Sequence, residues 1–307
     1  MKILITGGAG FIASNIADRY LELGHKVVIV DNLVTGQREN IPAAAAFYEL
    51  DICDPELKSI FEKERPDIVS HHAAQMDVRK SVADPIYDAT VNVLGSLNLL
   101  ENCVKWGVKK VIFASTGGAI YGEQDYFPAD EKHPLRPLSP YGITKLTTEK
   151  YLFFYKNTHG LTHTILRYAN IYGPRQNPHG EAGVVAIFCT RMLSGEQPVI
   201  NGDGKQTRDY VFVGDVVRAN ELALTNGDNG IFNVGTGKET DVNELFRKIA
   251  MHIDADIPER HGPAKPGEQM RSVLDASLIG REFGWQPSVD LEEGLKRTVA
   301  FFRGRNR

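Results

Sequence analysis

The sequence predicts an α/β protein in which a doubly wound parallel sheet is joined to a smaller α/β C-terminal domain. A short apolar run at residues 2–6 precedes a glycine-rich turn and a helical segment at 14–23. A second apolar run, residues 26–30, then ends in Asp31. Further apolar runs alternate with helical segments through the first half of the chain, which is typical of parallel strands linked by helical crossovers.

Composition and charge exclude several classes of protein. The 307 residues are 42% apolar and 24% charged, which is typical of globular domains with a sizeable core. A net charge of −4 gives no reason to expect a nucleic acid or an anionic membrane as partner. There is no 18-residue apolar run, and the first strand begins at Lys2, so neither a transmembrane helix nor a signal peptide is expected. Cys53, Cys103 and Cys189 lack Cys-x-x-Cys spacing, so we expect no disulfide framework, no metal site and a cytoplasmic location.

The turn after the first strand has the spacing Gly-x-x-Gly-x-x-Ala. Glycines allow the backbone to approach a pyrophosphate, which the N-terminus of the next helix stabilises through its free N–H groups. Asp31 follows ~20 residues later, where a carboxylate can accept hydrogen bonds from an adenosine ribose and would repel a 2′-phosphate. This Rossmann-type arrangement predicts NAD rather than NADP as cofactor. The expected contacts in the turn are Gly7, Gly10, Phe11 and Ile12.

Further parallel strands are predicted at residues 47–50, 68–71 and 111–115. The last of these ends at Ser115 and is followed by a second hydroxyl residue, Thr116. Open α/β sheets bind ligands at the carboxyl edge of their strands. The two hydroxyls are therefore candidates to contact a substrate.

Tyr141 and Lys145 are four residues apart in a segment that begins with Ser139 and Pro140. Proline favours the first turn of a helix, and helical residues four apart share one face. An ammonium ~4 Å from a phenol at an effective dielectric of ~20 favours the phenolate by about 4 kcal/mol. Such an interaction would lower the tyrosine pKa from ~10 to near 7. The pair is thus predicted to exchange a proton with a substrate hydroxyl.

A hydroxyl, a tyrosine and a lysine in this order, behind such a glycine turn, resemble the extended branch of the short-chain dehydrogenase/reductase superfamily. That branch usually has a third glycine where Ala13 stands. The resemblance implies that Tyr141 is the acid/base group and that Lys145 also bonds the nicotinamide ribose. It implies that Thr116, or alternatively Ser115, bonds the reacting substrate atom. Further implied cofactor positions are Asn32, Asp51, Ile52, Ala73, Ala74, Gln75 and Asn92.

The second half resembles the sugar-nucleotide epimerases and dehydratases of this superfamily. A sixth strand is predicted at residues 162–166, followed by Asn170 in an Asn-x-Tyr-Gly-Pro segment, where the family's asparagine bonds a substrate phosphate. A helix is predicted at 183–193, and a strand-like run at 209–212 is a candidate to return to the main sheet. Arg208 and Lys265 match basic residues that contact the pyrophosphate, although Lys265 replaces an arginine and so offers a point charge. Glu268 matches an acid that contacts a nucleoside ribose.

The resemblance implies a 4-epimerase that interconverts UDP-galactose and UDP-glucose through a transient 4-keto sugar, with NAD tightly bound. Other UDP-hexose 4-epimerases, acting on UDP-N-acetylglucosamine or UDP-glucuronate, remain alternatives. A 4,6-dehydratase usually has Asp-Glu directly after the active-site threonine, where this chain has Gly117 and Gly118. A non-catalytic dinucleotide sensor typically lacks the tyrosine or the lysine, whereas this chain has both Tyr141 and Lys145.

Ser272 matches a family position that borders carbon 2 of the sugar. A tyrosine there is associated with restriction to UDP-glucose and UDP-galactose. A serine is expected to leave room for an N-acetyl group, because an acetamido group cannot share space with an aromatic ring.

We expect residues 1–166 and a returning segment at about 208–235 to form the NAD-binding domain. Residues 167–207 and 236–307 are expected to form the nucleotide-sugar domain. Two helices have more apolar residues than one sheet-facing stripe needs, and the resemblance implies that they pair in a homodimer. These residues are Val93, Leu97, Leu100 and Val104 on one helix, and Tyr151, Phe154 and Tyr155 on the other.

Overall fold

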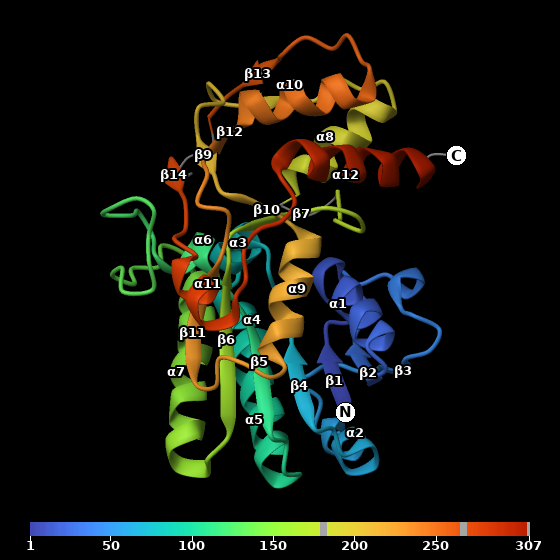
Figure 1. Ribbon diagram of the computed structural model, residues 1–307, viewed down its shortest axis with the longest axis vertical. Coiled ribbons are helices and arrows are strands. Elements are labelled where there is room, and N and C mark those ends of the chain that lie inside the picture. Colours follow the sequence, from blue (N-terminus) through green and yellow to red (C-terminus); the bar gives the residue numbers. More distant parts are fainter. Residues whose placement is uncertain (179–182, 265–268, 306–307) are drawn as a thin grey trace.

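A seven-stranded parallel sheet forms the centre of the larger domain (Figure 1) in a computed structural model that describes residues 1–178, 183–264 and 269–305. The strand order is β11-β6-β5-β4-β1-β2-β3, which reverses between β1 and β4 and so confirms the predicted doubly wound sheet. The strands are β1 (Lys2–Thr6), β2 (Lys26–Asp31), β3 (Ala46–Glu49), β4 (Ile68–His71), β5 (Lys110–Thr116), β6 (Thr162–Tyr168) and β11 (Gly230–Val234).

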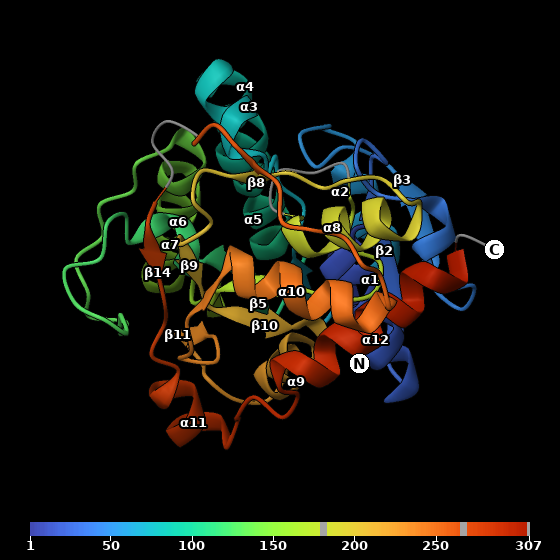
Figure 2. The ribbon, with the colours of Figure 1, turned by 90° about the horizontal axis from the view of Figure 1, so that it is seen from above.

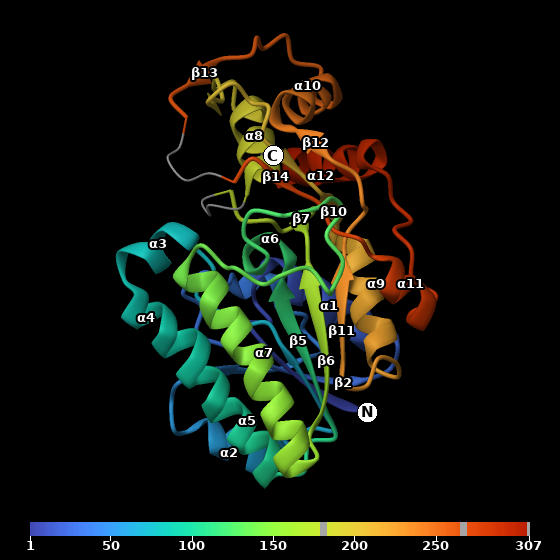
Figure 3. The ribbon, with the colours of Figure 1, turned by 90° about the vertical axis from the view of Figure 1, so that its left-hand side faces the viewer.

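Helices cover both faces of this sheet (Figure 3). Ile3 and Ile5 of β1 pack on one face, whereas Leu4 packs on the other. This alternation on a strand buried on both sides explains why these runs are apolar throughout. One face is covered by α1 (Phe11–Glu22), α9 (Val213–Ala223) and α11 (Ser277–Phe283), and the other by α2 (Leu57–Glu64), α5 (Gly95–Lys105) and α7 (Pro140–His159). Shorter helical segments are η1 (Arg38–Asn40), α3 (Val78–Ala83), α4 (Pro85–Ala89), the π-helical turn η2 (Thr90–Leu94) and α6 (Gly117–Ile120).

The strand-like run at 209–212 does not return to the main sheet, so that expectation is wrong. Its strand, β10 (Tyr210–Phe212), pairs with β7 (Asn170–Tyr172) in a separate two-stranded sheet. The free edge of β6 is occupied by β11, which pairs with it over five residues. Strand β10 pairs instead with β7, which follows β6 in the chain and lies beyond the end of the main sheet.

The smaller domain lies beyond the carboxyl ends of the parallel strands (Figures 1 and 2). Three helices, α8 (Val184–Leu193), α10 (Val242–Ile253) and α12 (Leu291–Arg305), bury their apolar faces in a common core. The short strands around them are β8 (Ile200–Asn201), β9 (Thr207–Arg208), β12 (Thr240–Asp241), β13 (His261–Gly262) and β14 (Arg271–Ser272).

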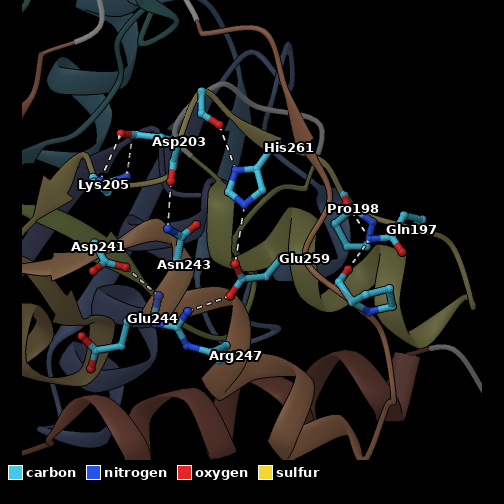
Figure 4. Close-up of polar contacts among 12 residues, drawn as sticks. Gln197, Pro198, Asp203, Lys205, Asp241, Asn243, Glu244, Arg247, Glu259 and His261 are labelled. Carbon is cyan, nitrogen blue, oxygen red and sulfur yellow. Dashed lines mark hydrogen bonds and ion pairs between the residues drawn. The ribbon is translucent and has the colours of Figure 1, made fainter.

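Polar contacts hold the loop between β8 and β9 against α10 (Figure 4). Asp241 caps α10 by accepting a hydrogen bond from the backbone nitrogen of Glu244 at 2.7 Å. Asn243, in the first turn, donates to the backbone oxygen of Asp203 at 2.9 Å. His261 of β13 contacts the backbone oxygen of Gly202 at 2.9 Å. The segment that leads into β9, and so to Arg208, is therefore anchored on both sides.

The two domains meet along more than one segment. β6 continues to Tyr168, two residues past the expected boundary, and α11 packs against β11 although it belongs to the segment assigned to the smaller domain. Asp18 of α1 forms an ion pair of 2.7 Å with Arg175, which follows β7. In the described part of the chain, no helix is both long and apolar enough to cross a membrane.

Part of the apolar surface expected for a homodimer lies inside the fold. Leu100 and Tyr155 are 1% and 3% exposed and pack against the sheet, because they lie on the inner faces of α5 and α7. The large apolar side chains that do reach the surface there include Leu94, Ile143, Phe153 and Phe154.

Candidate active site

The turn after β1 forms a backbone cradle at the carboxyl edge of the sheet. Gly7 has a left-handed conformation, with φ +71°, and a Cβ atom there would lie 2.7 Å from the backbone nitrogen of Ala73. Gly10 is the N-cap of α1 and receives no side-chain cap. Phe11 and Ile12 follow as the first residues of this 12-residue helix. A helix N-terminus beside close-packed glycine backbone fits a phosphate group.

Ala13 stands where the resembled family usually has a third glycine. Its methyl group is 2% exposed and packs in the core with Ile16. The fold therefore accommodates the extra carbon without opening the contact between helix and strand.

Asp31, the last residue of β2, is only 7% exposed. Its Oδ2 accepts a hydrogen bond from the backbone nitrogen of Ala9 at 2.9 Å, and its Oδ1 accepts one from Leu33 at 2.8 Å. Burial raises the pKa of this carboxyl group, while the two backbone hydrogen bonds oppose the shift. Asp31 thus anchors the glycine turn, and its contact with a ribose stays a prediction.

Asn32 and Asp51 lie together beyond the ends of β2 and β3. The Nδ2 atom of Asn32 donates to Oδ2 of Asp51 at 2.7 Å, and Oδ1 of Asp51 accepts from the backbone nitrogen of Cys53 at 2.8 Å. Burial acts to raise the pKa of Asp51, but these hydrogen bonds outweigh it and the pKa is lowered. Ile52 is buried beneath them.

A buried amide and carboxylate network connects the segment after β4 to the start of α7. The backbone nitrogen of Gln75 donates to Oδ1 of Asn92 at 2.8 Å. Asp88, which is fully buried, accepts from the side chains of Gln75 at 2.9 Å and Thr144 at 2.8 Å. Asn92 also donates to Thr144 at 3.1 Å. Because Thr144 precedes Lys145, this network fixes the helical turn that carries Tyr141 and Lys145. Ala73 and Ala74 lead into it from β4.

Helix α7 begins at Pro140 as predicted, with Ser139 as the N-cap that accepts a hydrogen bond from the backbone nitrogen of Gly142 at 3.2 Å. Tyr141 is half-buried and Lys145 is 4% exposed. Their chain spacing therefore puts them on one helical face, directed at the end of β5.

The expected lowering of the Tyr141 pKa is absent from this structure. The Nζ atom of Lys145 lies 6.0 Å from the centroid of the Tyr141 ring and donates to the backbone oxygen of Ala114 at 2.8 Å. Burial raises the pKa of Tyr141, and the nearby Asp88 carboxylate adds to the shift. Burial also lowers the pKa of Lys145 to about 8, although Asp88 and Glu149 oppose that shift. The prediction considered only the charge of the ammonium and left out the burial of both groups.

Of the two candidate hydroxyls, Thr116 lies nearer to Asn170, whereas Ser115 is engaged inside the sheet. The hydroxyl of Ser115, 3% exposed, donates to Oε1 of Glu149 at 2.6 Å inside the sheet domain. Thr116 is half-buried, and successive strand residues point to opposite faces. A Cβ atom on Gly118 would lie 3.9 Å from the Thr116 hydroxyl and 3.7 Å from Oδ1 of Asn170. The side chains of Thr116 and Asn170 thus both lie beside Gly118.

A buried ion pair lies directly below these groups. Glu149 follows Lys145 by one helical turn and pairs with Arg167 of β6, with an Nη2–Oε2 distance of 2.6 Å and 2% exposure on each side chain. Arg167 also donates to the Tyr121 hydroxyl at 3.0 Å. Because Ser115 and Arg167 are register partners on β5 and β6, Glu149 ties α7 to both strands.

The candidate substrate residues converge from three short strands. Arg208 lies on β9, where its register partner on β14 is Ser272. Asn170 begins β7, and its backbone nitrogen donates to the oxygen of Asp209, the residue after Arg208, at 2.9 Å. Ser272 is 3% exposed. The remaining two candidates, Lys265 and Glu268, lie outside the described residues.

Sequence reasoning missed several residues that organise the site. Glu149 continues the four-residue spacing of Tyr141 and Lys145, so the helical pattern could have indicated it. Arg167 and Asp209 stand next to motifs that were singled out, but received no role. Asp88 accepts a hydrogen bond from Asn92, four residues later, but only folding brings it to Gln75 and Thr144.

Among the described residues, no cluster of three or more His, Cys, Asp or Glu side chains could hold a metal ion. The glycine cradle and the Tyr141–Lys145 pair at one sheet edge define a nucleotide-binding α/β protein of the Rossmann type.

Comparisons with known proteins give the family. A sequence profile of the NAD dependent epimerase/dehydratase family matches residues 3–235. A putative UDP-glucose 4-epimerase of Methanocaldococcus jannaschii is 48% identical over 305 residues, covering 99% of both chains. The structure of a UDP-glucose 4-epimerase from Thermotoga maritima, solved with UDP-glucose, is 52% identical with a TM-score of 0.98 over the whole of both chains. That of a Thermus thermophilus UDP-glucose 4-epimerase, in complex with NAD, is 46% identical with a TM-score of 0.95 over 99% of both chains. The chain therefore belongs to the NAD dependent epimerase/dehydratase family.

Proposed function

We propose that this protein is a UDP-hexose 4-epimerase that interconverts UDP-galactose and UDP-glucose with NAD as a bound cofactor. The proposal is supported by the position of Tyr141 and Lys145 on one face of α7 and by the proximity of Thr116 to Asn170, which both lie beside Gly118. Relatives that match the chain from end to end are UDP-glucose 4-epimerases, one solved with UDP-glucose and one with NAD.

The residues of the larger domain fit a dinucleotide. The cradle of Gly7 and Gly10 at the start of α1 would hold the pyrophosphate, where a side chain at Gly7 would collide with Ala73. Asp31 and the Asn32–Asp51 pair would hold the adenosine end. The segment from Ala73 to Gln75 and the Lys145 ammonium would line the nicotinamide end. The chemistry that NAD supplies when bound is reversible acceptance of a hydride from carbon 4 of the sugar.

Tyr141 supplies the acid/base step. Its phenolic oxygen takes the proton of the sugar 4-hydroxyl and later returns it, while the Thr116 hydroxyl donates a hydrogen bond to the same substrate oxygen. Because burial raises the pKa of Tyr141, the phenolate must be stabilised by positive charge brought close to it in the complex. Lys145, held on the same helical face, is one source of that charge.

Epimerisation requires tight binding of the diphosphate and weak contacts to the sugar. The 4-keto sugar must rotate in the site between the two steps, so that its other face meets the cofactor. Asn170 and Arg208 would bind the diphosphate. A guanidinium fork suits such an anion. Lys265 and Glu268, outside the described residues, are proposed to complete the grip on phosphate and ribose.

A 4,6-dehydratase is the less favoured alternative within the family. Its elimination step needs an acid and a base directly after the active-site hydroxyl. Here that position holds Gly117, where a Cβ atom would lie 2.4 Å from a side-chain carbon of Leu274, and Gly118. The packing leaves no room for a carboxylate side chain at the first position.

The acceptance of N-acetylated sugars remains a prediction. Ser272 is small but 3% exposed, and its neighbours on β9 and in the chain segment after it surround it. We propose that its lack of bulk allows some turnover of UDP-N-acetylgalactosamine.

The assembly is proposed to be a homodimer located in the cytoplasm. Leu94 is 57% exposed, Phe153 65% and Phe154 49% on helices that cover one face of the sheet. Pairing of these helices with those of a second copy would bury the surface that the single chain leaves exposed.

The proposed function is tested by incubating pure protein with UDP-galactose, UDP-N-acetylgalactosamine and UDP-glucuronate and separating the products. We expect rapid formation of UDP-glucose without an added oxidant, and no turnover of UDP-glucuronate. Preferred turnover of UDP-glucuronate, or a 4-keto-6-deoxy product, would contradict the proposal.

A further inference from the structure

Asp209 has a buried carboxylate to which the proposed reaction assigns no role. It lies between β9 and β10, directly after Arg208, and is 1% exposed. Its Oδ1 accepts hydrogen bonds from the backbone nitrogen of Thr236 at 2.8 Å and from the Thr236 hydroxyl at 2.6 Å. Its Oδ2 accepts from the backbone nitrogen of Gly237 at 3.1 Å. The carboxylate therefore holds the loop that follows β11 in the main sheet.

The space around this carboxylate is closely fitted. A Cβ atom on Gly235 would lie 2.5 Å from Oδ2 of Asp209, so the loop can reach the carboxylate only because this residue is glycine. The backbone nitrogen of Leu274, two residues after Ser272, also points at Oδ2 from 3.4 Å. One side chain thus touches both the sheet domain and the segment that carries Ser272.

The backbone of Asp209 joins the candidate substrate strands. Its nitrogen donates to the oxygen of Ser272 at 2.9 Å, and its oxygen accepts from the nitrogen of Asn170 at 2.9 Å. Arg208 is its neighbour in the chain. Asn170, Arg208 and Ser272 are therefore positioned relative to one another through a single residue, whose side chain fixes it to the larger domain.

We infer that Asp209 is a positioning residue for substrate binding: its carboxylate holds Asn170 and Arg208 in the arrangement that grips the diphosphate. This inference rests on the proposed function. The four groups that surround the carboxylate are all hydrogen-bond donors: the backbone nitrogen and hydroxyl of Thr236, and the backbone nitrogens of Gly237 and Leu274. Each of these buried donors needs an acceptor, which the carboxylate provides. Burial raises the pKa of Asp209, and the hydrogen bonds from Thr236 and Gly237 act to keep the carboxyl group ionised.

Replacing Asp209 by Asn tests the carboxylate with little change in shape. One of the two oxygens becomes an NH₂ group, which cannot accept hydrogen bonds and faces N–H donors. The backbone that links β9 to β10 would then be held less firmly, and the side chains of Asn170 and Arg208 would lose their fixed separation.

Asp215 provides a matched control six residues later. It is also 1% exposed, and it accepts from the backbone nitrogen and hydroxyl of Ser288 at 2.9 and 2.6 Å and from the backbone nitrogen of Val289 at 3.1 Å. Its donors are of the same kinds as those of Asp209. However, it fixes the segment that leads into α12, so Asp215→Asn reports the general cost of losing a buried carboxylate in this region.

The experiment measures the dissociation constant of UDP by calorimetry on the NAD-loaded protein, together with Tm and the NAD content of each variant. We expect Asp209→Asn to weaken UDP binding at least tenfold with unchanged NAD content, and Asp215→Asn to weaken it less than twofold at a similar loss of Tm. Thr236→Val, which removes one of the hydrogen bonds to the carboxylate, should weaken UDP binding at least threefold and serves as the test if Asp209→Asn does not fold.

Equal weakening in Asp209→Asn and Asp215→Asn would overturn the inference, because a general loss of stability would then explain both. An unchanged UDP affinity in Asp209→Asn, or in Thr236→Val, would also overturn it. If the unaltered protein binds no UDP, the proposed function fails first and the positioning role fails with it.

Discussion

At the scale of single residues, burial decides how Tyr141 and Lys145 behave. Both groups lose water in the fold, so burial disfavours the charged form of each, which is the form that the proposed mechanism uses. The carboxylates of Asp88 and Glu149 oppose this for Lys145 but not for Tyr141. Burial therefore lowers the pKa of Lys145 to about 8 and raises the pKa of Tyr141 on the same helical face.

Tyr141→Phe removes only the phenolic oxygen. We expect kcat to fall by about 10²–10⁴-fold, the usual contribution of a positioned acid/base group. Circular dichroism, Tm and NAD content should match those of the unaltered protein. Epimerisation at a near-normal rate would show that another group exchanges the proton.

Lys145 makes a specific contribution to the pH dependence of stability. Its folded pKa of about 8 is below its ordinary value of 10.5, so the cost of burying the charge is fully present below pH 8. Between pH 8 and 10.5 the unfolded chain binds more protons than the folded one, and stability rises with pH. Relative to Lys145→Met, NAD-free protein should gain about 2 kcal/mol in free energy of unfolding between pH 8 and pH 10. Parallel denaturation curves for the two proteins at both pH values would contradict this.

At the scale of elements, helix α7 carries both groups of the proposed acid/base pair and is fixed to the sheet by a third residue. Tyr141, Lys145 and Glu149 recur every four residues on its inner face, and Glu149 joins the helix to β5 and β6. The position of the phenol is thus determined by an ion pair two turns further along the helix.

Glu149→Gln should leave Arg167 buried without its countercharge. Removing one partner of a buried pair costs about 3–5 kcal/mol, measured as a loss in the free energy of unfolding. Glu221→Gln is the control, because Glu221 pairs with Arg19 at the surface, where such pairs contribute about 0.2–1 kcal/mol. Equal losses in the two variants would refute the structural role given to Glu149.

The elements also show how far sequence patterns reach. Strands β1 and β4 have the predicted bounds, since a run buried on both faces is apolar throughout. Strand β10 was assigned to the wrong sheet, because its pairing depends on which edge β11 leaves free. Ser115 and Thr116 are consecutive residues of β5, so their side chains lie on opposite faces of the sheet. The sequence alone did not show which of the two faces carries the site. The role of Asp209 is not evident from the sequence because its donors, Thr236, Gly237 and Leu274, are far away in the chain.

At the scale of the whole molecule, we propose that two domains together complete the site. The larger domain contributes the glycine cradle and α7, and the smaller one contributes β9 and β14. Contacts such as the Asp18–Arg175 ion pair hold the two together on the α1 side. Substitutions in β9 or β14 should therefore weaken substrate binding even when the larger domain stays intact.

The proposed homodimer predicts a concentration-independent dimer mass by light scattering at micromolar protein. Phe153→Glu combined with Phe154→Glu should give a monomer, because two charges would replace the exposed aromatic surface of α7. Met251→Glu, at an equally exposed apolar residue on α10, serves as the control and should remain dimeric. A monomeric mass for the unaltered protein would exclude the dimer.

The central claim is that the protein inverts carbon 4 of a UDP-hexose by removing and returning the same hydrogen. The most direct test is to convert UDP-galactose in D₂O without added cofactor and to analyse the product by mass spectrometry and NMR. The account predicts UDP-glucose with no deuterium on carbon 4, since only the hydroxyl proton held by Tyr141 exchanges with solvent. Deuterium on carbon 4, or a strict need for an added oxidant, would contradict it.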